Sequence, residues 1–209
     1  MSVKSVLTDL GGVLIHYSID LAIAAWARLA HVDAAVVAES VMMDEAWEAF
    51  EVGRLTEPEF CSHLRRQSGL DLTDDELIEG WNSIYIGVNA PVERLLRDVG
   101  SRGIRVVAVT NTNVTHQRAW QERFAASLRF LDAVYSSWQV GARKPDPAFF
   151  EDVLESEQAS PHEALFIDDV ERYVEVAEGL GIDGILYTGA DGLRDAFAAR
   201  GLLTTQSTP

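Results

Sequence analysis

The sequence is poor in cysteine and contains no long apolar run. Among 209 residues the single cysteine is Cys61, so no internal disulfide can form, which is typical of a reducing compartment. No stretch of about 18 apolar residues predicts a membrane span. The first residues also lack the basic, apolar and small-residue pattern of a secretory signal. We therefore expect a cytoplasmic protein without a membrane partner.

Basic residues are scarce as well. Seventeen Lys and Arg stand against 33 Asp and Glu, which gives a formal net charge of −16. This balance excludes a nucleic-acid surface, because such a surface needs clustered Lys and Arg. Any anionic ligand must therefore meet a local positive site or a metal ion. Lys4 and Lys144 are the only lysines, so Lys144, in an internal loop, is a candidate for such a site. Nothing in the composition indicates an oligomeric state.

The overall composition, with 47% apolar and 24% charged residues, is that of an ordinary globular protein. Apolar runs at 3–8, 104–110, 163–168 and 183–189 predict buried strands, and helical patterns separate them in the second half of the chain. Such alternation predicts an α/β fold with a parallel sheet covered on both faces. Residues 18–88 instead predict four or five helices and no strand. We expect a core domain of residues 1–15 and 89–209, a helical domain of residues 16–88, and a frayed tail at 202–209.

Polar side chains follow three of the predicted strands. Asp9 follows the first, Thr110 and Asn111 end the second, and Asp168 with Asp169 end the third. Ligands of parallel α/β sheets bind beyond the carboxyl ends of the strands, so these groups are expected to converge there. The alternative is that each is only a helix N-cap or a turn residue.

The pair in "FIDD" gives the sharpest chemical signal. Two adjacent carboxylates near Asp9 repel one another unless a hard cation lies between them, and Mg²⁺ takes such oxygen ligands together with substrate phosphate. Lys144, in "GARKPDP", would supply a positive charge for a phosphate group. The alternative for Lys144 is a solvated surface lysine.

Four motifs in order, "DLGGVL", "VTNTN", "RKPDP" and "FIDDV", resemble those of the haloacid dehalogenase-like hydrolases. The match is to the subgroup with a small helical cap inserted after the first strand, and within it to sugar-phosphate phosphatases of the glucose-1-phosphate phosphatase kind. The resemblance implies a Rossmann-like core, a helical-bundle cap and a Mg²⁺-dependent phosphatase. Its substrate would be a small phosphorylated metabolite such as a sugar phosphate.

The resemblance also implies residue roles. Asp9 would be the nucleophile that forms an aspartyl-phosphate. Thr110, with Asn111 beside it, would bind the phosphoryl oxygens, and Lys144 would stabilise their charge. The implied magnesium ligands are Asp9, Asp168, Asp169 and the backbone carbonyl of Gly11.

One departure leaves other functions open. Phosphatases of this family usually carry a second Asp two residues after the nucleophile as general acid and base, whereas this chain has Gly11. His16 could lie over the site, with a hinge or surface histidine as the alternative. A catalytically weak phosphate- and metal-binding regulatory protein is therefore a second hypothesis, and a dehalogenase, which would lack the acidic pair, a third. Candidate substrate-binding residues in the helical domain are Trp47, Glu51 and Arg54, although a Trp at helical spacing is more often core.

Overall fold

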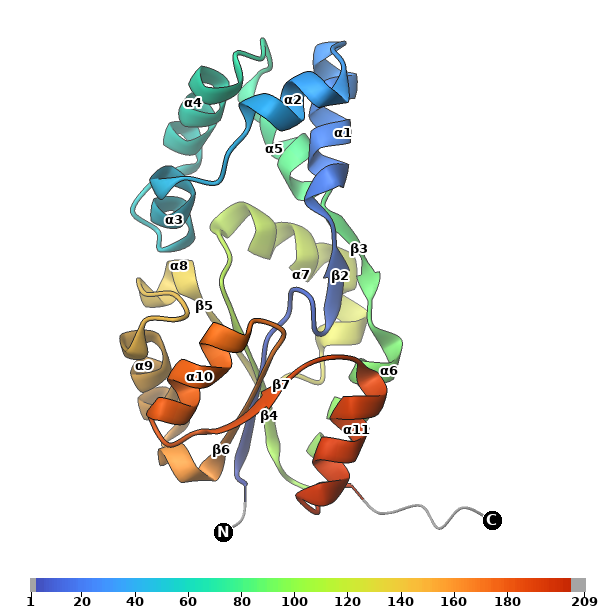
Figure 1. The fold of residues 1–209 in the computed structure, drawn as a ribbon, viewed down its shortest axis with the longest axis vertical. Helices are drawn as coiled ribbons and strands as arrows, with labels where there is room; N and C mark the ends of the chain where they lie inside the picture. The colour runs from blue at the N-terminus through green and yellow to red at the C-terminus, as the bar shows by residue number, and fades with distance from the viewer. Residues whose placement is uncertain (1–2, 204–209) are drawn as a thin grey trace.

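A five-stranded parallel sheet forms the centre of the protein, in a computed structural model that describes residues 3–203. Its strand order is β5-β4-β1-β6-β7, and all pairings are parallel (Figure 1). The bounds are Ser5–Thr8 for β1, Arg105–Thr110 for β4, Ala133–Ser136 for β5, Ala164–Asp168 for β6 and Asp183–Leu186 for β7. The predicted α/β fold is confirmed. Positions 204–209 of the expected tail lie outside the described residues.

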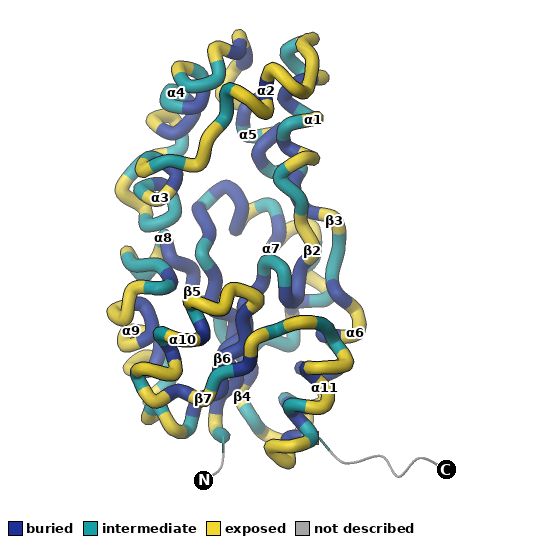
Figure 2. Tube along the Cα trace, in the orientation of Figure 1, coloured by how far each residue is buried: buried dark blue, intermediate teal, exposed yellow. Residues whose placement is uncertain are grey.

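Helices cover both faces of this sheet. Successive strand residues point to opposite faces, so Val6 of β1 belongs to one apolar cluster and Leu7 to the other. Figure 2 shows the buried residues gathered along the strands and the exposed ones on the outer helix surfaces. One face is covered by α6 (Ala90–Gly100), α7 (Val114–Leu128) and α11 (Ala190–Ala199), and the other by α9 (Pro147–Glu157) and α10 (Glu171–Gly179). The short helices α8 (Ser137–Val140) and η1 (Pro161–Glu163) follow β5 and precede β6.

Several helices begin at a capping residue. The Asp146 side chain accepts a hydrogen bond from the Ala148 N–H at 3.0 Å, and Pro147 is the first residue of α9. The Glu76 carboxylate accepts from the Thr73 N–H at 2.8 Å, as in a capping box. The helical pattern of residues 34–43 continues to Met43, but α2 ends at Ser40.

The first five helices of the described chain form a second layer, the helical insert, which lies beyond the carboxyl ends of the core strands (Figure 1). They are α1 (Ile19–Ala30), α2 (Ala34–Ser40), α3 (Glu45–Glu51), α4 (Glu57–Ser68) and α5 (Asp74–Asn82). The expectation of no strand in this region was wrong. Two short strands, β2 (Ile15–Tyr17) and β3 (Tyr85–Val88), pair antiparallel and carry the chain into and out of the insert. Strands of three and four residues are too short for a readable period-two pattern.

Among the described residues, no single helix is long and apolar enough to cross a bilayer. The α1 and α2 helices reach that length and composition only as a pair, and the pair is bent by 117°.

Candidate active site

The ends of three neighbouring strands bring the candidate catalytic residues together. Asp9 directly follows β1, whereas Thr110 and Asp168 are the last residues of β4 and β6. Because β4 and β6 flank β1 in the sheet, their carboxyl ends lie side by side. The Asp9 N–H donates to the Ile167 carbonyl at 2.9 Å, which continues the β1–β6 ladder up to the site. The predicted convergence is therefore observed.

Lys144 lies at the centre of this group and is 1% exposed. Its Nζ is 2.9 Å from Asp9 Oδ1 and 2.6 Å from Asp168 Oδ2. The alternative of a solvated surface lysine is therefore wrong. Asn111 fixes the backbone of this loop twice, since its Oδ1 accepts from the Lys144 N–H and its Nδ2 donates to the Lys144 carbonyl, both at 2.9 Å.

Burial and charge set the protonation of this group. Burial raises the pKa of Asp9 to about 7, although the Lys144 ammonium opposes that rise. Burial alone would lower the pKa of Lys144, but the Asp9 and Asp168 carboxylates outweigh it and raise this pKa above its ordinary value. Lys144 therefore stays charged at neutral pH. Burial and the neighbouring Asp168 also raise the pKa of Asp169.

Three carboxylates offer a site for a divalent cation. Oxygen atoms of Asp9, Asp168 and Asp169 all lie within 4.8 Å of one another. When all are ionised, these groups and Lys144 have a formal sum of two negative charges, which a divalent cation offsets. The donors are hard carboxylate oxygens, and two of the three residues, Asp9 and Asp169, line a cavity that would admit water and phosphate, which fits Mg²⁺.

The two glycines after Asp9 have different roles. Gly12 has a φ of +81°, and a Cβ there would lie 2.2 Å from Asp169 Oδ2, so only glycine leaves this carboxylate in place. Gly11 does not have a positive φ. A Cβ at Gly11 would lie 3.2 Å from Cε1 of Tyr17, so the Tyr17 ring covers the position from which a second Asp would project.

A cavity of about 240 Å³ lies between the strand ends and the helical insert, and Asp9 and Lys144 line it. Of the insert residues proposed from sequence, Glu51 lines the cavity. Trp47 does not: it is 4% exposed and packs edge-on against Trp81, with ring centroids 4.5 Å apart. Trp47 is therefore part of the insert core. Arg54 and His16 are exposed and also lie outside the lining.

Sequence reasoning missed much of the cavity wall. These residues are mostly apolar or aromatic, and they come from the insert, from β3 and its approach, from α7 and from the start of α10: Met43, Trp81, Ile84, Tyr85, His116, Trp120, Val170 and Tyr173. His116 is buried with its Nε2 3.1 Å from the Trp81 carbonyl, and burial lowers its pKa to about 3, so it is neutral. The only sequence signal for His116 and Trp120 is that their helix follows the strand ending at Thr110.

Arg143, also missed, joins the core to the insert. Its Nη1 is 2.7 Å from Glu48 Oε1 and its Nε is 3.0 Å from Glu51 Oε2, both on α3. The Ser137 hydroxyl donates to the Glu51 carbonyl at 2.6 Å. Burial raises the pKa of Glu51, and the Arg143 guanidinium opposes that rise. The loop that carries Lys144 is therefore fastened to the helical insert.

The fold and the site together indicate a hydrolase. A buried aspartate, a lysine and an acidic pair lie at the strand ends of a parallel sheet, beneath a helical insert. The family model described as haloacid dehalogenase-like hydrolase matches residues 3–181, so the chain belongs to that family.

Several relatives are named as phosphatases. The chain is 26% identical to D-ribitol-5-phosphate phosphatase of Bacteroides thetaiotaomicron over 187 residues, which is 87% of this chain and 90% of that protein. It is 29% identical to the sesquiterpene phosphatase astK of Aspergillus oryzae over 88% of this chain and 90% of that protein. A crystal structure of a haloacid dehalogenase family enzyme from B. thetaiotaomicron, in complex with magnesium and inorganic phosphate, is similar with a TM-score of 0.76 and 26% identity. That match covers 88% of this chain and 93% of the other.

Proposed function

We propose that the protein is a Mg²⁺-dependent phosphatase that hydrolyses a small phosphate monoester through an aspartyl-phosphate intermediate. The observation that carries this proposal is Lys144, which is buried between Asp9 and Asp168 at 2.9 and 2.6 Å. A lysine ammonium at this position stabilises the charge of a phosphoryl group without solvent screening. The names of the relatives support the same reaction.

In this proposal Asp9 is the nucleophile. Its carboxylate oxygen attacks phosphorus, the ester P–O bond breaks, and the alcohol leaves with a proton taken from water. A water molecule then attacks the aspartyl-phosphate, which releases inorganic phosphate and restores Asp9. Thr110 orients the phosphoryl oxygens, Asn111 beside it positions the Lys144 backbone, and Lys144 holds the negative charge of the phosphoryl group throughout.

Magnesium would be held by Asp9, Asp168, Asp169 and the carbonyl of Gly11. When bound, Mg²⁺ neutralises phosphate oxygens and orients the ester for in-line attack. The magnesium in the similar bacterial structure supports this assignment. Residues 16–88 would act as a cap domain that excludes bulk water from Asp9.

The substrate is proposed here only as a small phosphorylated metabolite. A sugar phosphate is the expectation from sequence, and the ribitol-5-phosphate named for one relative supports a polyol ester. The sesquiterpene named for the other points to an apolar ester. Both fall within the proposed reaction.

The test is phosphate release from a panel of phosphate monoesters, measured with Mg²⁺ and with excess EDTA. We expect release that requires Mg²⁺ and that Asp9→Asn abolishes, because an amide cannot form the acyl phosphate. Asp195→Asn, at an exposed site on α11, is the matched control and should retain full activity. Circular dichroism and melting would establish that both variants fold. Wild-type turnover by Asp9→Asn would refute the covalent mechanism, and no release from any ester would favour the regulatory hypothesis.

A further inference from the structure

Beyond the phosphoryl end, the cavity walls are mostly aromatic and aliphatic. Trp120 of α7 is 3% exposed and Ile84 is 4% exposed, and both face the cavity with Tyr85. Apolar walls of this kind stabilise an organic group in proportion to the apolar area that it buries. The hydroxyl groups of a polyol would lose their hydrogen bonds to water on entering this cavity.

Three polar residues that line the cavity, Glu51, His116 and Asn111, already have partners. Glu51 is paired with Arg143, whose guanidinium also contacts Glu48. The Nε2 atom of His116 bonds to the Trp81 carbonyl, and the Asn111 amide is bonded on both sides to Lys144. A polyol would therefore leave hydroxyl groups unpaired, at a cost of roughly tenfold in affinity for each.

The entrance is apolar as well. Met43 is 67% exposed, Tyr17 is 46% exposed and Val170 is 40% exposed, and all three line the cavity. These three residues come from three separate segments. The apolar rim is therefore not simply the apolar face of one helix. Water-exposed apolar side chains around an apolar cavity mark a ligand site.

Among the wall residues, Trp81 and Arg143 each carry a buried N–H group without a hydrogen-bond partner, although Arg143 Nε forms an ion pair with Glu51 Oε2 at 3.0 Å. Trp81 is 4% exposed, and its indole N–H has no hydrogen-bond partner among the described residues. Buried N–H groups are seldom left unpaired in native proteins. A single acceptor on an otherwise apolar ligand would satisfy it.

We infer that this cavity selects a phosphate monoester whose organic group is apolar, an alkyl or aryl group with at most one or two acceptors, in place of a sugar or polyol. The inference rests on the proposed phosphatase function and names the substrate class of the same site. It differs from the sugar phosphate expected from sequence, and the experiment below compares the two.

The experiment compares two esters with the same five carbon atoms, n-pentyl phosphate and ribitol 5-phosphate. Both are esters of primary alcohols, and the hydroxyl groups of ribitol make it the better leaving group, so a faster reaction of the pentyl ester would reflect the cavity and not the leaving group. We expect kcat/KM for the pentyl ester to exceed that for the ribitol ester by at least about 100-fold. The four free hydroxyl groups of ribitol 5-phosphate would lose their hydrogen bonds to water on entering the cavity. Along the series ethyl, propyl, butyl and pentyl phosphate, kcat/KM should rise roughly threefold to fourfold for each CH₂ group.

Two adjacent methionines give a matched pair of variants. Met43 and Met42 are similarly exposed, at 67% and 64%, but only Met43 lines the cavity. Met43→Gln should lower the pentyl-to-ribitol ratio roughly threefold or more, whereas Met42→Gln should leave it unchanged.

The possible failures are distinguishable. Phosphate release with a ribitol rate equal to or above the pentyl rate, or with no rise along the alkyl series, would overturn the substrate class alone. Equal effects of Met43→Gln and Met42→Gln would overturn the assignment of the rim. No release from any ester with Mg²⁺ would overturn the phosphatase proposal and this inference with it.

Discussion

A single buried lysine determines the chemistry of the site at the scale of residues. An isolated ammonium in a protein interior is unstable, so Lys144 depends on Asp9 and Asp168, and these carboxylates depend on it. Lys4, the only other lysine, pairs with Glu163 at the surface and is 60% exposed. The two lysines therefore form a natural comparison between a buried and an exposed ion pair.

Lys144→Met should lower the free energy of unfolding by about 3–5 kcal/mol, because removing one partner leaves buried carboxylates uncompensated. Urea unfolding of the metal-free protein measures this. Lys4→Met is the control, and it should leave the midpoint nearly unchanged because surface ion pairs contribute little. Equal losses in the two variants would contradict the assigned importance of the buried pair.

Asp9 gives the stability of the metal-free protein a defined pH dependence. Its pKa is about 7 in the folded protein and 3.8 in an unstructured chain. Between these values the folded state binds more protons than the unfolded state, so the Asp9 contribution is fully present below about pH 3.8 and is lost as the pH rises to about 7. In Asp9→Asn this contribution is absent.

We therefore expect the free energy of unfolding of the wild type, minus that of Asp9→Asn, to fall between about pH 4 and pH 7 and to level off above. Urea unfolding in EDTA at several pH values measures the difference. A difference that stays constant from about pH 5 to pH 7 would show that Asp9 is already ionised in the folded protein, with its pKa held low by Lys144.

At the scale of elements, the fastening between the helical insert and the core lies next to the catalytic loop. Arg143 precedes Lys144 and holds Glu48 and Glu51 of α3. A movement of α3 away from the core must break these ion pairs. Opening of the insert is therefore coupled to the position of the Lys144 backbone.

Arg143→Gln should loosen α3. We expect amide hydrogen exchange over Glu45–Glu51 to become roughly fivefold faster, as loss of about 1 kcal/mol predicts. Hydrogen-exchange mass spectrometry measures it. Arg28→Gln removes an ion pair that lies wholly within the insert, between Arg28 and Glu79, and should leave α3 unchanged. Faster exchange over α3 in both variants would mean that either substitution loosens the whole insert. Arg143 would then not be a specific link between α3 and the core.

The elements also show how far sequence reasoning reaches. The strand ends and their acidic residues were predictable, because long apolar runs such as "IRVVAVT" indicate a buried strand. The parallel arrangement of the strands then brings these ends together. The scarcity of lysine singled out Lys144. By contrast, β2 and β3 have too few residues for a pattern. Trp81 and Trp120 meet in one wall only because distant helices pack together, which no local spacing reveals.

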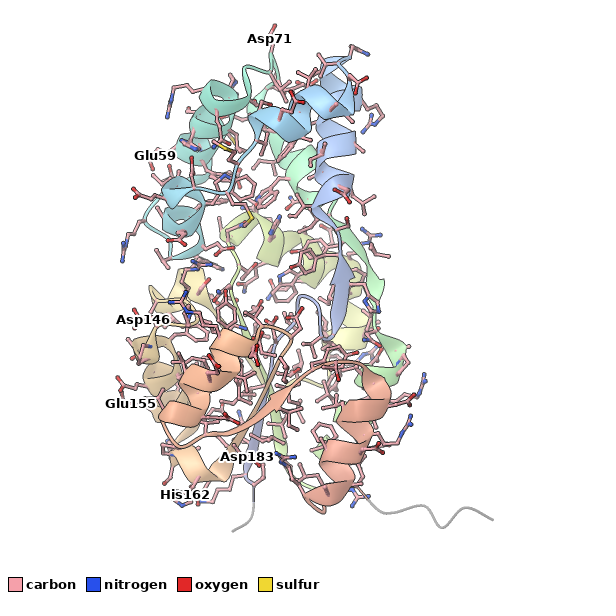
Figure 3. All side chains as sticks on the ribbon, in the orientation of Figure 1. Glu59, Asp71, Asp146, Glu155, His162 and Asp183 are labelled. Carbon is pink, nitrogen blue, oxygen red and sulfur yellow. The ribbon has the colours of Figure 1, made fainter. Side chains whose placement is uncertain are left out.

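The whole molecule carries a formal charge of −16, and this charge is spread over both layers. Figure 3 labels Glu59 and Asp71 on the helical insert and Asp146 and Glu155 on the core, with their side chains pointing outward. Such a field repels a phosphate ester and attracts a divalent cation before either reaches the site. Salt shortens its range from about 30 Å at 0.01 M to about 8 Å at 0.15 M.

Added salt should therefore act in opposite directions on the two proposed ligands. Between 0.01 and 0.15 M NaCl we expect the KM for a dianionic phosphate ester, at saturating Mg²⁺, to fall by roughly threefold or more. Over the same range the Mg²⁺ concentration that gives half-maximal activity should rise by a similar factor. Steady-state kinetics at constant pH measures both quantities. A control variant with two exposed carboxylates outside the cavity lining neutralised, Asp71→Asn with Glu155→Gln, should weaken both trends together. If the two quantities moved in the same direction with salt, the local field of Lys144 and the bound metal, and not the net charge of the molecule, would govern how ligands approach Asp9.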